Sequence, residues 1–201
     1  MAAMARPMRR DAARNRERLL REAADVFTEQ GLAGSLEEIA RRSGVSIGTL
    51  YNHFPTRDVL LDALLPPRLA ALDEFAARAE AEPDAWTAFT GFVENLLNQL
   101  TSDRGLLEAF TGDFPAAAQL AEACHRGMTR LSTVLDRARR AGALRADASD
   151  EDVAHLLWAL ALLGENAGAP AWQRSLQLVL DGLRTSRQAD GSVDDAGLTD
   201  P

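Results

Sequence analysis

Apolar residues recur every three or four positions along most of this chain, the spacing that places them on one face of an α-helix. In residues 11–30, for example, the repeating apolar positions are Leu20, Ala23, Ala24 and Phe27. No stretch of useful length alternates β-branched or aromatic residues with polar ones, so no strand is predicted. The pattern therefore indicates an all-α protein.

Residues with strong capping preferences divide the first part of the chain into short helices. Gly31 is expected to end the first helix, because glycine takes the left-handed conformation easily. Leu32 can then pack back onto Phe27, as in a Schellman cap. Ser35 and Glu38 have the spacing of a capping box, which predicts that a second helix begins there.

A tight turn at residues 43–45 is expected to separate the second helix from a third. Ser46 can cap this third helix, residues 47–54. Pro55 ends it, because the residue before a proline avoids helical geometry. Thr56 can then cap a fourth helix.

Two adjacent prolines, Pro66 and Pro67, fall inside the fourth helical stretch. A proline inside a helix removes a backbone donor and clashes with the preceding turn, at a cost of about 3 kcal/mol. We therefore expect a break or strong kink near residues 64–67. Other prolines and N-cap residues predict five more helices, which begin near the following residues: Pro83, Asp103, Pro115, Ser149 and Pro170.

The expected organisation is a head of three helices followed by a larger helical domain, with about nine helices in all. Residues 11–57 would form the head and residues 58–186 the second domain. Residues 1–10 are expected to be a disordered basic arm. Residues 187–201 are expected to be a disordered acidic tail, because their Gly, Asp and Ser residues bury too little apolar surface to order them.

The composition excludes several classes of protein. A chain of 201 residues is long enough to bury a core without covalent help. The single cysteine, Cys124, excludes an internal disulfide framework and a multi-cysteine metal site. No apolar stretch reaches the roughly 20 residues of a membrane span, and the N-terminus lacks an apolar signal region. We expect a soluble, cytoplasmic protein that uses no metal or other cofactor and does not contact a membrane.

The charge of the chain is segregated along its length. The net charge is −8, which taken alone argues against a polyanionic partner. Residues 1–60, however, carry ten arginines against eight acidic residues, which leaves a net charge of −10 for the rest of the chain. Seven of those arginines lie within the first 21 residues. The N-terminal part is therefore compatible with a nucleic acid.

The segment LEEIARRSGVSIGTLYNHF has the spacing of a helix-turn-helix. Ala40 is small enough for two helices to cross closely, Gly44 permits the tight turn, and Leu50 buries the third helix against the first two. The outward positions of the third helix offer hydroxyl, amide and imidazole groups suited to phosphates and base edges: Ser46, Ile47, Gly48, Thr49, Tyr51, Asn52 and His53. On spacing alone, a three-helix core with an ordinary polar surface remains an alternative.

The sequence GVSIGTLYNHFPTRDVLLDAL closely resembles the signature of the TetR family of transcriptional regulators, and the resemblance covers about residues 14–64. It implies that Tyr51, His53 and Arg57 bind phosphates, and that Ser35 meets a phosphate at the N-terminus of the second helix. It also implies that the following residues approach bases: Ser46, Ile47, Gly48, Thr49 and Asn52.

The resemblance further implies a homodimer that binds a palindromic operator in double-stranded DNA. The family is expected to dimerise through its last two helices, for which the apolar candidates are Trp158, Leu162, Trp172, Leu176 and Leu180. Ordinary core packing is the alternative explanation for these residues. The ending LVLDGLR is most similar to regulators with an SbtR-like C-terminal domain. The function implied is that of a repressor that leaves DNA when a small apolar molecule binds, with the fourth helix transmitting the signal.

Candidate residues for the effector pocket lie on apolar stripes of the middle helices. They are Trp86, Phe89, Val93, Phe110, Cys124 and Met128, with Asn95, Asn98 and His125 as possible polar contacts. Plain core or surface is the alternative for each of them. The identity of the effector does not follow from these residues.

Two other functions are possible in principle. A small helical enzyme could use Cys124 and His125 as nucleophile and base. Consecutive helical residues point about 100° apart, however, which argues against this pairing. The chain also lacks a glycine-rich phosphate loop and metal-ligand spacing. The other alternative is a helical protein-interaction module without DNA binding.

Overall fold

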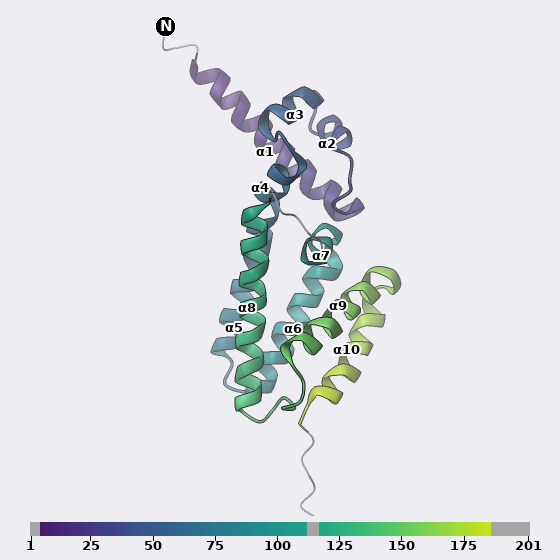
Figure 1. Cartoon of the computed structure of the whole chain (residues 1–201). Helices are drawn as coiled ribbons and strands as arrows, with labels where there is room; N and C mark the ends of the chain where they lie inside the picture. Colours follow the sequence, from purple (N-terminus) through teal and green to yellow (C-terminus); the bar gives the residue numbers. More distant parts are fainter. Residues whose placement is uncertain (1–4, 112–116, 186–201) are drawn as a thin grey trace, which may run out of the picture.

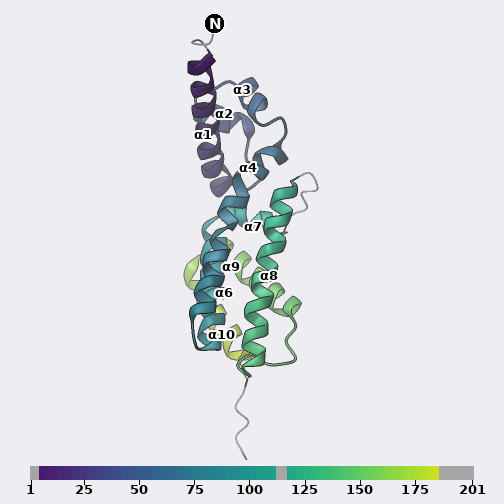
Figure 2. The ribbon, with the colours of Figure 1, turned by 90° about the vertical axis from the view of Figure 1, so that its left-hand side faces the viewer.

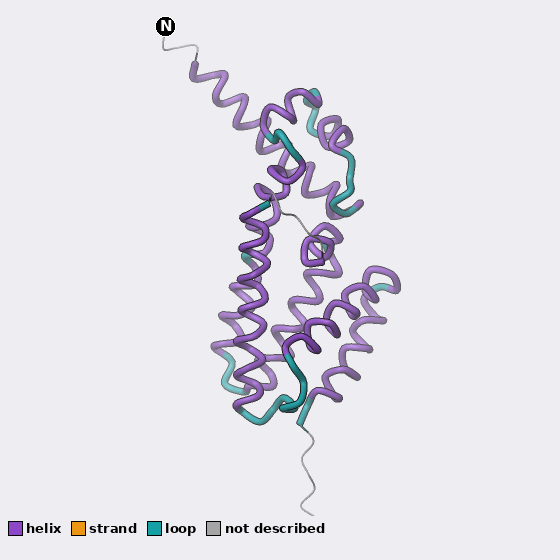
Figure 3. The backbone as a smooth tube through the Cα atoms, viewed as in Figure 1, coloured by secondary structure: helices purple, strands orange, loops and turns teal. Residues whose placement is uncertain are grey.

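The computed structural model describes residues 5–111 and 117–185, and apart from one isolated bridge its regular elements there are α-helices (Figures 1 and 3). The all-α prediction is therefore confirmed. The ten helices of these ranges are α1 (Ala5–Gln30), α2 (Leu36–Arg42), α3 (Ile47–His53), α4 (Arg57–Leu69), α5 (Ala71–Ala81), α6 (Ala85–Ser102), α7 (Arg104–Thr111), α8 (Ala118–Arg140), α9 (Asp150–Ala167) and α10 (Ala169–Leu183).

The helices form an elongated molecule with a small head at one end. The head consists of α1, α2 and α3, and α4 leads from it into the body, which holds α5 to α10 (Figures 1 and 2). Phe27, Ile39, Leu50 and Phe54 of the head are 0–1% exposed, and they belong to one hydrophobic core that continues into the body. In the body, α9 packs against α10 and against α6.

The first helix begins earlier than the sequence predicted. It starts at Ala5 rather than near residue 11, so residues 5–10, expected to be a disordered arm, are helical. Three of these six residues are arginine, which favours helix, and Pro7 lies in the first turn, where a proline is tolerated. Residues 1–4 of the arm and 186–201, which include the expected acidic tail, lie outside the described residues.

Both predicted caps between α1 and α2 differ in detail from the prediction. Gly31 has the expected left-handed φ of 75°, but its N–H donates to the Phe27 carbonyl in a simple αL cap. The N–H of Leu32, which would complete a Schellman motif, donates instead to the Glu108 carboxylate at 2.6 Å. Ser35 caps α2 through the Glu38 N–H, yet the Glu38 carboxylate accepts from Arg41 and Arg42 rather than completing a capping box.

The expected break near residues 64–67 falls later in the chain. Helix α4 continues through Pro66 and Pro67 to Leu69, and the separation from α5 falls at Ala70. The two prolines lie in the last turn, where the helix loses few hydrogen bonds, and the Ala70 N–H still donates to the Pro66 carbonyl at 3.2 Å. The displaced break divides one expected helix into two, which accounts for ten helices rather than nine.

No helix within the described ranges combines the length and the apolar character needed to cross a membrane.

Candidate nucleic-acid interface

The turn between α2 and α3 has the geometry that fixes a helix-turn-helix. Gly44 adopts a left-handed φ of 65°. The Val45 N–H donates to the Ala40 carbonyl and the Gly44 N–H to the Arg41 carbonyl, both at 3.1 Å, which is a complete Schellman motif. Ala40 itself is buried. The sequence prediction for the turn is confirmed at each of its named positions.

Helix α3 is anchored by very few side chains. Within its seven residues only Leu50 is fully buried, and Phe54 follows as the buried C-cap residue. At its N-terminus the Ser46 hydroxyl accepts from the Thr49 N–H at 3.1 Å. The short helix is therefore anchored by its buried inner side and by its two ends, which leaves its outer side exposed to solvent.

The predicted outer side of α3 is on the surface of the head. Ser46, Gly48, Tyr51 and Asn52 are exposed, and Tyr51 retains 45% of its accessible surface. The remaining predicted residues, Ile47, Thr49 and His53, are half-buried at the edges of this face. The exposed face of α3 is thus formed by Ser46, Gly48, Tyr51 and Asn52, whereas Ile47 packs partly against the core.

Arg57 does not belong to that face. Its guanidinium donates to the carbonyls of Leu32 at 2.5 Å and Gly34 at 2.8 Å, and it lies over the Phe27 ring. These are acceptors inside the head, so in the free protein the Arg57 guanidinium is engaged there, and its contact with phosphate stays a prediction. Arg57 fixes the loop between α1 and α2 to the start of α4.

Ser35 lies on the surface at the N-terminus of α2, as expected. Its hydroxyl accepts from the Glu38 N–H and donates to the Glu37 carboxylate at 2.9 Å. The oxygen is therefore already engaged in capping.

The basic residues of α2 are paired with acidic residues of the head. Arg41 and Arg42 both donate to Glu38, and Arg42 also donates to Glu29. The hydrogen bonds from Arg41 and then Arg42 lower the pKa of the Glu38 carboxyl to about 2. These two arginines consequently contribute little free positive charge to the head.

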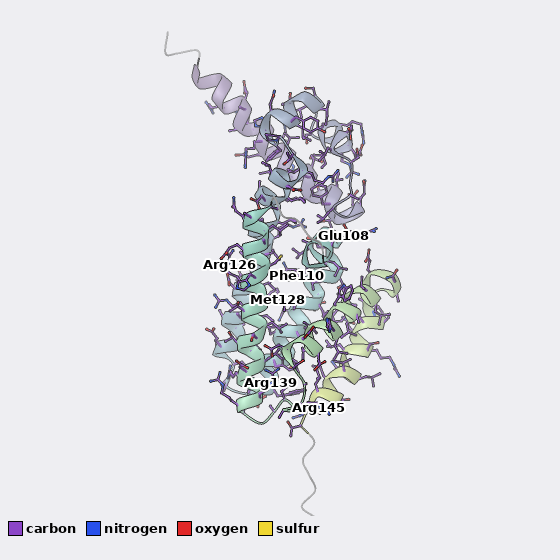
Figure 4. The ribbon with its side chains drawn as sticks, viewed as in Figure 1. Glu108, Phe110, Arg126, Met128, Arg139 and Arg145 are labelled. Carbon is purple, nitrogen blue, oxygen red and sulfur yellow. The ribbon has the colours of Figure 1, made fainter. Side chains whose placement is uncertain are left out.

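The body contains a cavity of about 320 Å³ between α6, α7, α8 and α9. Phe110 and Met128, both predicted, line it, and Figure 4 marks them where α7 and α8 face each other. Met128 is 44% exposed and Trp158 is 47% exposed, so the cavity opens to solvent beside these two side chains. The full lining is Leu96, Leu100, Leu107, Phe110, Met128, Leu131, Ala154, His155, Leu157 and Trp158.

The other predicted pocket residues lie elsewhere. Phe89 and Val93 are fully buried core residues, and Trp86 stacks beneath Arg184 at 5.3 Å from its ring centroid. Cys124 is half-buried beside the Ala109 carbonyl. The polar candidates do not line the cavity either. Asn95 and Asn98 donate to carbonyls of their own helix, and His125 is exposed.

The sequence reasoning missed the contribution of α9 to the cavity. Ala154, Leu157 and Trp158 recur at helical spacing, but the same pattern also fits a dimer face or a core stripe. His155, exposed beside them, is the polar side chain of the lining that sequence analysis did not select.

Three of the five predicted dimer residues are buried inside the single chain. Trp172, Leu176 and Leu180 of α10 are 1–4% exposed, so they belong to the body's own core and cannot form a face between chains. Trp158 and Leu162 of α9 are exposed at 47% and 37%. Two further leucines are also exposed: Leu156 of α9 at 37% and Leu178 of α10 at 67%.

Two polar junctions join the head to the body through α7. At the first, Asp103 pairs with Arg68 of α4, lies 3.4 Å from the Thr28 hydroxyl of α1 and accepts from the Leu106 N–H at 3.1 Å. At the second, Glu108 accepts from the Leu32 N–H. Figure 4 places Glu108 where α7 meets the head. The helix that supplies Leu107 and Phe110 to the cavity therefore also contacts the loop that Arg57 fixes.

The enzyme alternative finds no support in this geometry. Burial raises the pKa of the Cys124 thiol, which disfavours the thiolate that a nucleophile requires. His125 is exposed, whereas Cys124 is half-buried.

A helix-turn-helix head with an exposed polar third helix, joined to a helical body that contains a cavity, defines a class of helix-turn-helix transcriptional regulators. A family model of bacterial regulatory proteins of the tetR family matches residues 19–64. A second model, for the C-terminal domain of SbtR-like transcriptional regulators, matches residues 84–185. The chain belongs to the TetR family, a family of regulators rather than enzymes.

Two solved structures of TetR regulators support this assignment. The chain is similar to a TetR transcriptional regulator from Streptomyces coelicolor, with 30% identity and a TM-score of 0.56 over 85% of this chain and 99% of that one. It is similarly related to a TetR regulator from Mycobacterium vanbaalenii, with 32% identity and a TM-score of 0.55 over 89% of this chain and 99% of that one.

The similarity to curated proteins is more local. The chain is 37% identical over 71 residues to the HTH-type transcriptional regulator SrpR of Pseudomonas putida, which is 35% of this chain and 33% of that protein. It is 29% identical over 80 residues to the uncharacterized HTH-type transcriptional regulator YvdT of Bacillus subtilis, which is 39% of this chain and 41% of that protein. The chain therefore aligns with less than half the length of each of these two curated relatives.

Proposed function

We propose that this regulator binds a palindromic site in double-stranded DNA as a homodimer and leaves it when a small apolar molecule enters the cavity of the body. The observation that carries the proposal is the exposed polar face of α3. The buried side chains of Leu50 and Phe54 anchor this helix to the head. Repression is the direction of control that we propose.

On DNA, α3 enters the major groove in this proposal. Tyr51, His53 and Ser35 contact phosphates, and the short side chains at the start of α3 approach base edges, which are read by hydrogen bonds and apolar contacts. The base-contacting set is Ser46, Ile47, Gly48, Thr49 and Asn52. Two heads of a symmetric pair would meet half-sites about 34–36 Å apart, or somewhat more.

The outer surface of α9 supports the homodimer. Leu156, Trp158 and Leu162 are exposed there, whereas Leu157 and Leu160 of the same helix are buried inside the body. A helix that is apolar on both its inner and outer sides is typical of one covered on both sides. A second copy packed on α9, with Leu178 of α10 at the edge, would bury this surface.

The cavity supports a small, mostly apolar effector. Its volume of about 320 Å³ lies at the lower end of the range for small-molecule sites. Nine of its ten lining residues are apolar or aromatic, and His155 offers a polar contact. An effector there would touch α7, whose Asp103 and Glu108 junctions with the head provide a route by which binding can change DNA affinity.

The test is a fluorescence-anisotropy titration of the full chain with duplexes from its own upstream region. Tyr51→Ala is expected to weaken all duplexes alike, because phosphates carry no sequence information, whereas Asn52→Ala is expected to relax preference mainly at one base pair. Failure of the unaltered chain to bind any duplex at low salt would overturn the proposal and favour a protein-interaction module. Identical effects of the two substitutions would overturn the residue roles.

Gly48→Ala is expected to stabilise the head by about 1 kcal/mol while it weakens DNA binding. A methyl group at this position meets only the Ser46 hydroxyl, 3.8 Å away, so nothing in the free protein opposes it. On DNA the same methyl would occupy the space between the helix backbone and the groove. Urea unfolding and anisotropy measure the two effects.

The matched control for Gly48→Ala is Gly91→Ala in α6, where an added methyl meets no neighbour within 4 Å. The control should gain similar stability and leave DNA affinity unchanged. Unchanged DNA affinity in Gly48→Ala would contradict close approach of this backbone to DNA.

Ala154→Leu is expected to abolish stabilisation by compounds that bind the cavity, because the larger side chain fills part of the space they need. A compound at 100 times its Kd stabilises the parent by about 2.7 kcal/mol. Thermal unfolding with a panel of monocyclic aromatic and short aliphatic compounds measures this. Ala121→Leu, on the exposed side of α8, is the control. Equal stabilisation of Ala154→Leu and the parent would place the compounds at another site.

A further inference from the structure

The first part of α1 has no buried side chain among those that the structure describes. From residue 10 to residue 18 no side chain is buried, and Leu19 is the first that is. The tetR family model also begins its match at residue 19. Residues 5–18 are therefore a helical stretch that precedes the family match, and its described side chains lie outside the core; we refer to residues 5–18 as the N-terminal extension.

The extension stands beyond α3 at the end of the molecule furthest from the body. In both Figure 1 and Figure 2, the first turns of α1 continue past α3 in the direction away from α8, α9 and α10. Arg16 lies over the Phe54 ring at 5.2 Å from its centroid, which ties the base of the extension to the residue that caps α3. The extension is thus fixed next to the face that α3 offers to DNA.

The positive charge of the N-terminal region resides in this extension. Residues 1–18 contain six arginines and two acidic residues, a net charge of +4. Residues 19–64, which the tetR family model matches, contain four arginines and seven acidic residues, a net charge of −3. The helix-turn-helix by itself is therefore an acidic unit that would repel a polyanion at long range.

The arginines of the helix-turn-helix do not compensate for this charge. Arg21 is paired with Glu22 at 3.5 Å, Arg41 and Arg42 are paired with Glu38 and Glu29, and Arg57 binds carbonyls inside the head. In the extension, by contrast, the arginines with described side chains are all exposed: Arg10, Arg14, Arg16 and Arg18. The nearest acidic contact of Arg14 is Asp11 at 4.0 Å, a pair in which both side chains are about two-thirds exposed. Such pairs yield easily to a competing phosphate.

We propose that the N-terminal extension is a second DNA-contacting element, which binds the phosphate backbone flanking the sequence that α3 reads. This rests on the proposed function, because it needs DNA on α3. The extension spans fourteen residues, or about 21 Å of helix. Each DNA strand offers one phosphate per about 3.4 Å over such a length. The extension supplies affinity and salt dependence, and α3 supplies sequence preference.

The test compares two full-length variants that lose the same charge. In the first, Arg6, Arg9, Arg10 and Arg14 are replaced by alanine, which favours helix as strongly as arginine and leaves the fold intact. The control replaces four arginines of the body: Arg78, Arg126, Arg140 and Arg174. Circular dichroism verifies that both variants fold. Anisotropy titrations at several salt concentrations then give the dependence of log K on log salt concentration.

The extension variant is expected to bind at least about tenfold more weakly than the control at low salt. Each lost phosphate contact lowers the salt slope by about 0.9, so up to about 3.6 for four contacts. The loss should be equal for specific and non-specific duplexes. Removing the base pairs outside the half-sites should weaken the parent but not the extension variant.

Two results would overturn the inference while leaving the proposed function intact. One is an extension variant whose salt slope equals that of the body control. The other is a parent protein that is indifferent to removal of the flanking base pairs, which would mean that the arginines act only by long-range attraction. Failure of the parent itself to bind DNA would overturn the proposed function and this inference together.

Discussion

Asp103→Ala is expected to lower the free energy of unfolding by about 3 kcal/mol, because it removes one partner of a buried ion pair. Asp103 is 6% exposed at the corner between α6 and α7. Its loss would leave the Arg68 guanidinium without its carboxylate and the Leu106 N–H at the start of α7 without its cap. The value is at the lower end of the usual range because 26% of the Arg68 side chain remains in solvent.

Urea unfolding followed by circular dichroism measures this effect. Asp136→Ala is the matched control, because its pair with Arg139 is 57% exposed on the aspartate side and such surface pairs contribute 0–1 kcal/mol. Equal midpoints for Asp103→Ala and Asp136→Ala would show that the junction is not a major source of stability. Asp103→Asn, which keeps an acceptor for the Leu106 N–H, should fall between them.

Leu50→Ala is expected to destabilise the head by about 2–5 kcal/mol and to abolish DNA binding, since it removes the one fully buried side chain of α3. The body should remain folded. All three tryptophans, Trp86, Trp158 and Trp172, lie in the body, so tryptophan fluorescence reports its unfolding separately from the head.

Val59→Ala provides the control for Leu50→Ala, because Val59 belongs to the adjoining start of α4 but is 43% exposed. It should bind DNA with near-parental affinity. Near-parental DNA affinity in Leu50→Ala, or a parallel loss of the tryptophan signal in the body, would contradict a locally anchored α3.

The parts of the site that the sequence predicted correctly depend on local geometry. Gly44 needs its left-handed conformation for the turn, and Ser46 caps α3 within three residues of its own position. Helix periodicity then determines that Leu50 points inward while Tyr51 and Asn52 point outward. Each of these relations joins residues less than two helical turns apart, so it can be predicted from neighbouring positions in one sequence.

The features that the sequence did not reveal depend on contacts between distant segments. The acceptors of Arg57 lie 25 and 23 residues away, and nothing in the spacing distinguishes them from a phosphate. Likewise, an apolar stripe does not indicate what covers it. Trp172 and Trp158 have similar helical patterns, yet one is 1% exposed within the chain's own core and the other is 47% exposed.

The contact between α1 and α7 limits how heads and bodies of such regulators can be exchanged. A side chain at Gly31 would overlap the Glu108 carboxylate, and a side chain at Gly105 would press on the Phe27 carbonyl at 3.0 Å. The two surfaces are therefore shaped as a matched pair. A chimera that carries a foreign DNA-binding head on this body would keep the contact between α1 and α7 only if the corresponding α7 residues were transplanted with the head.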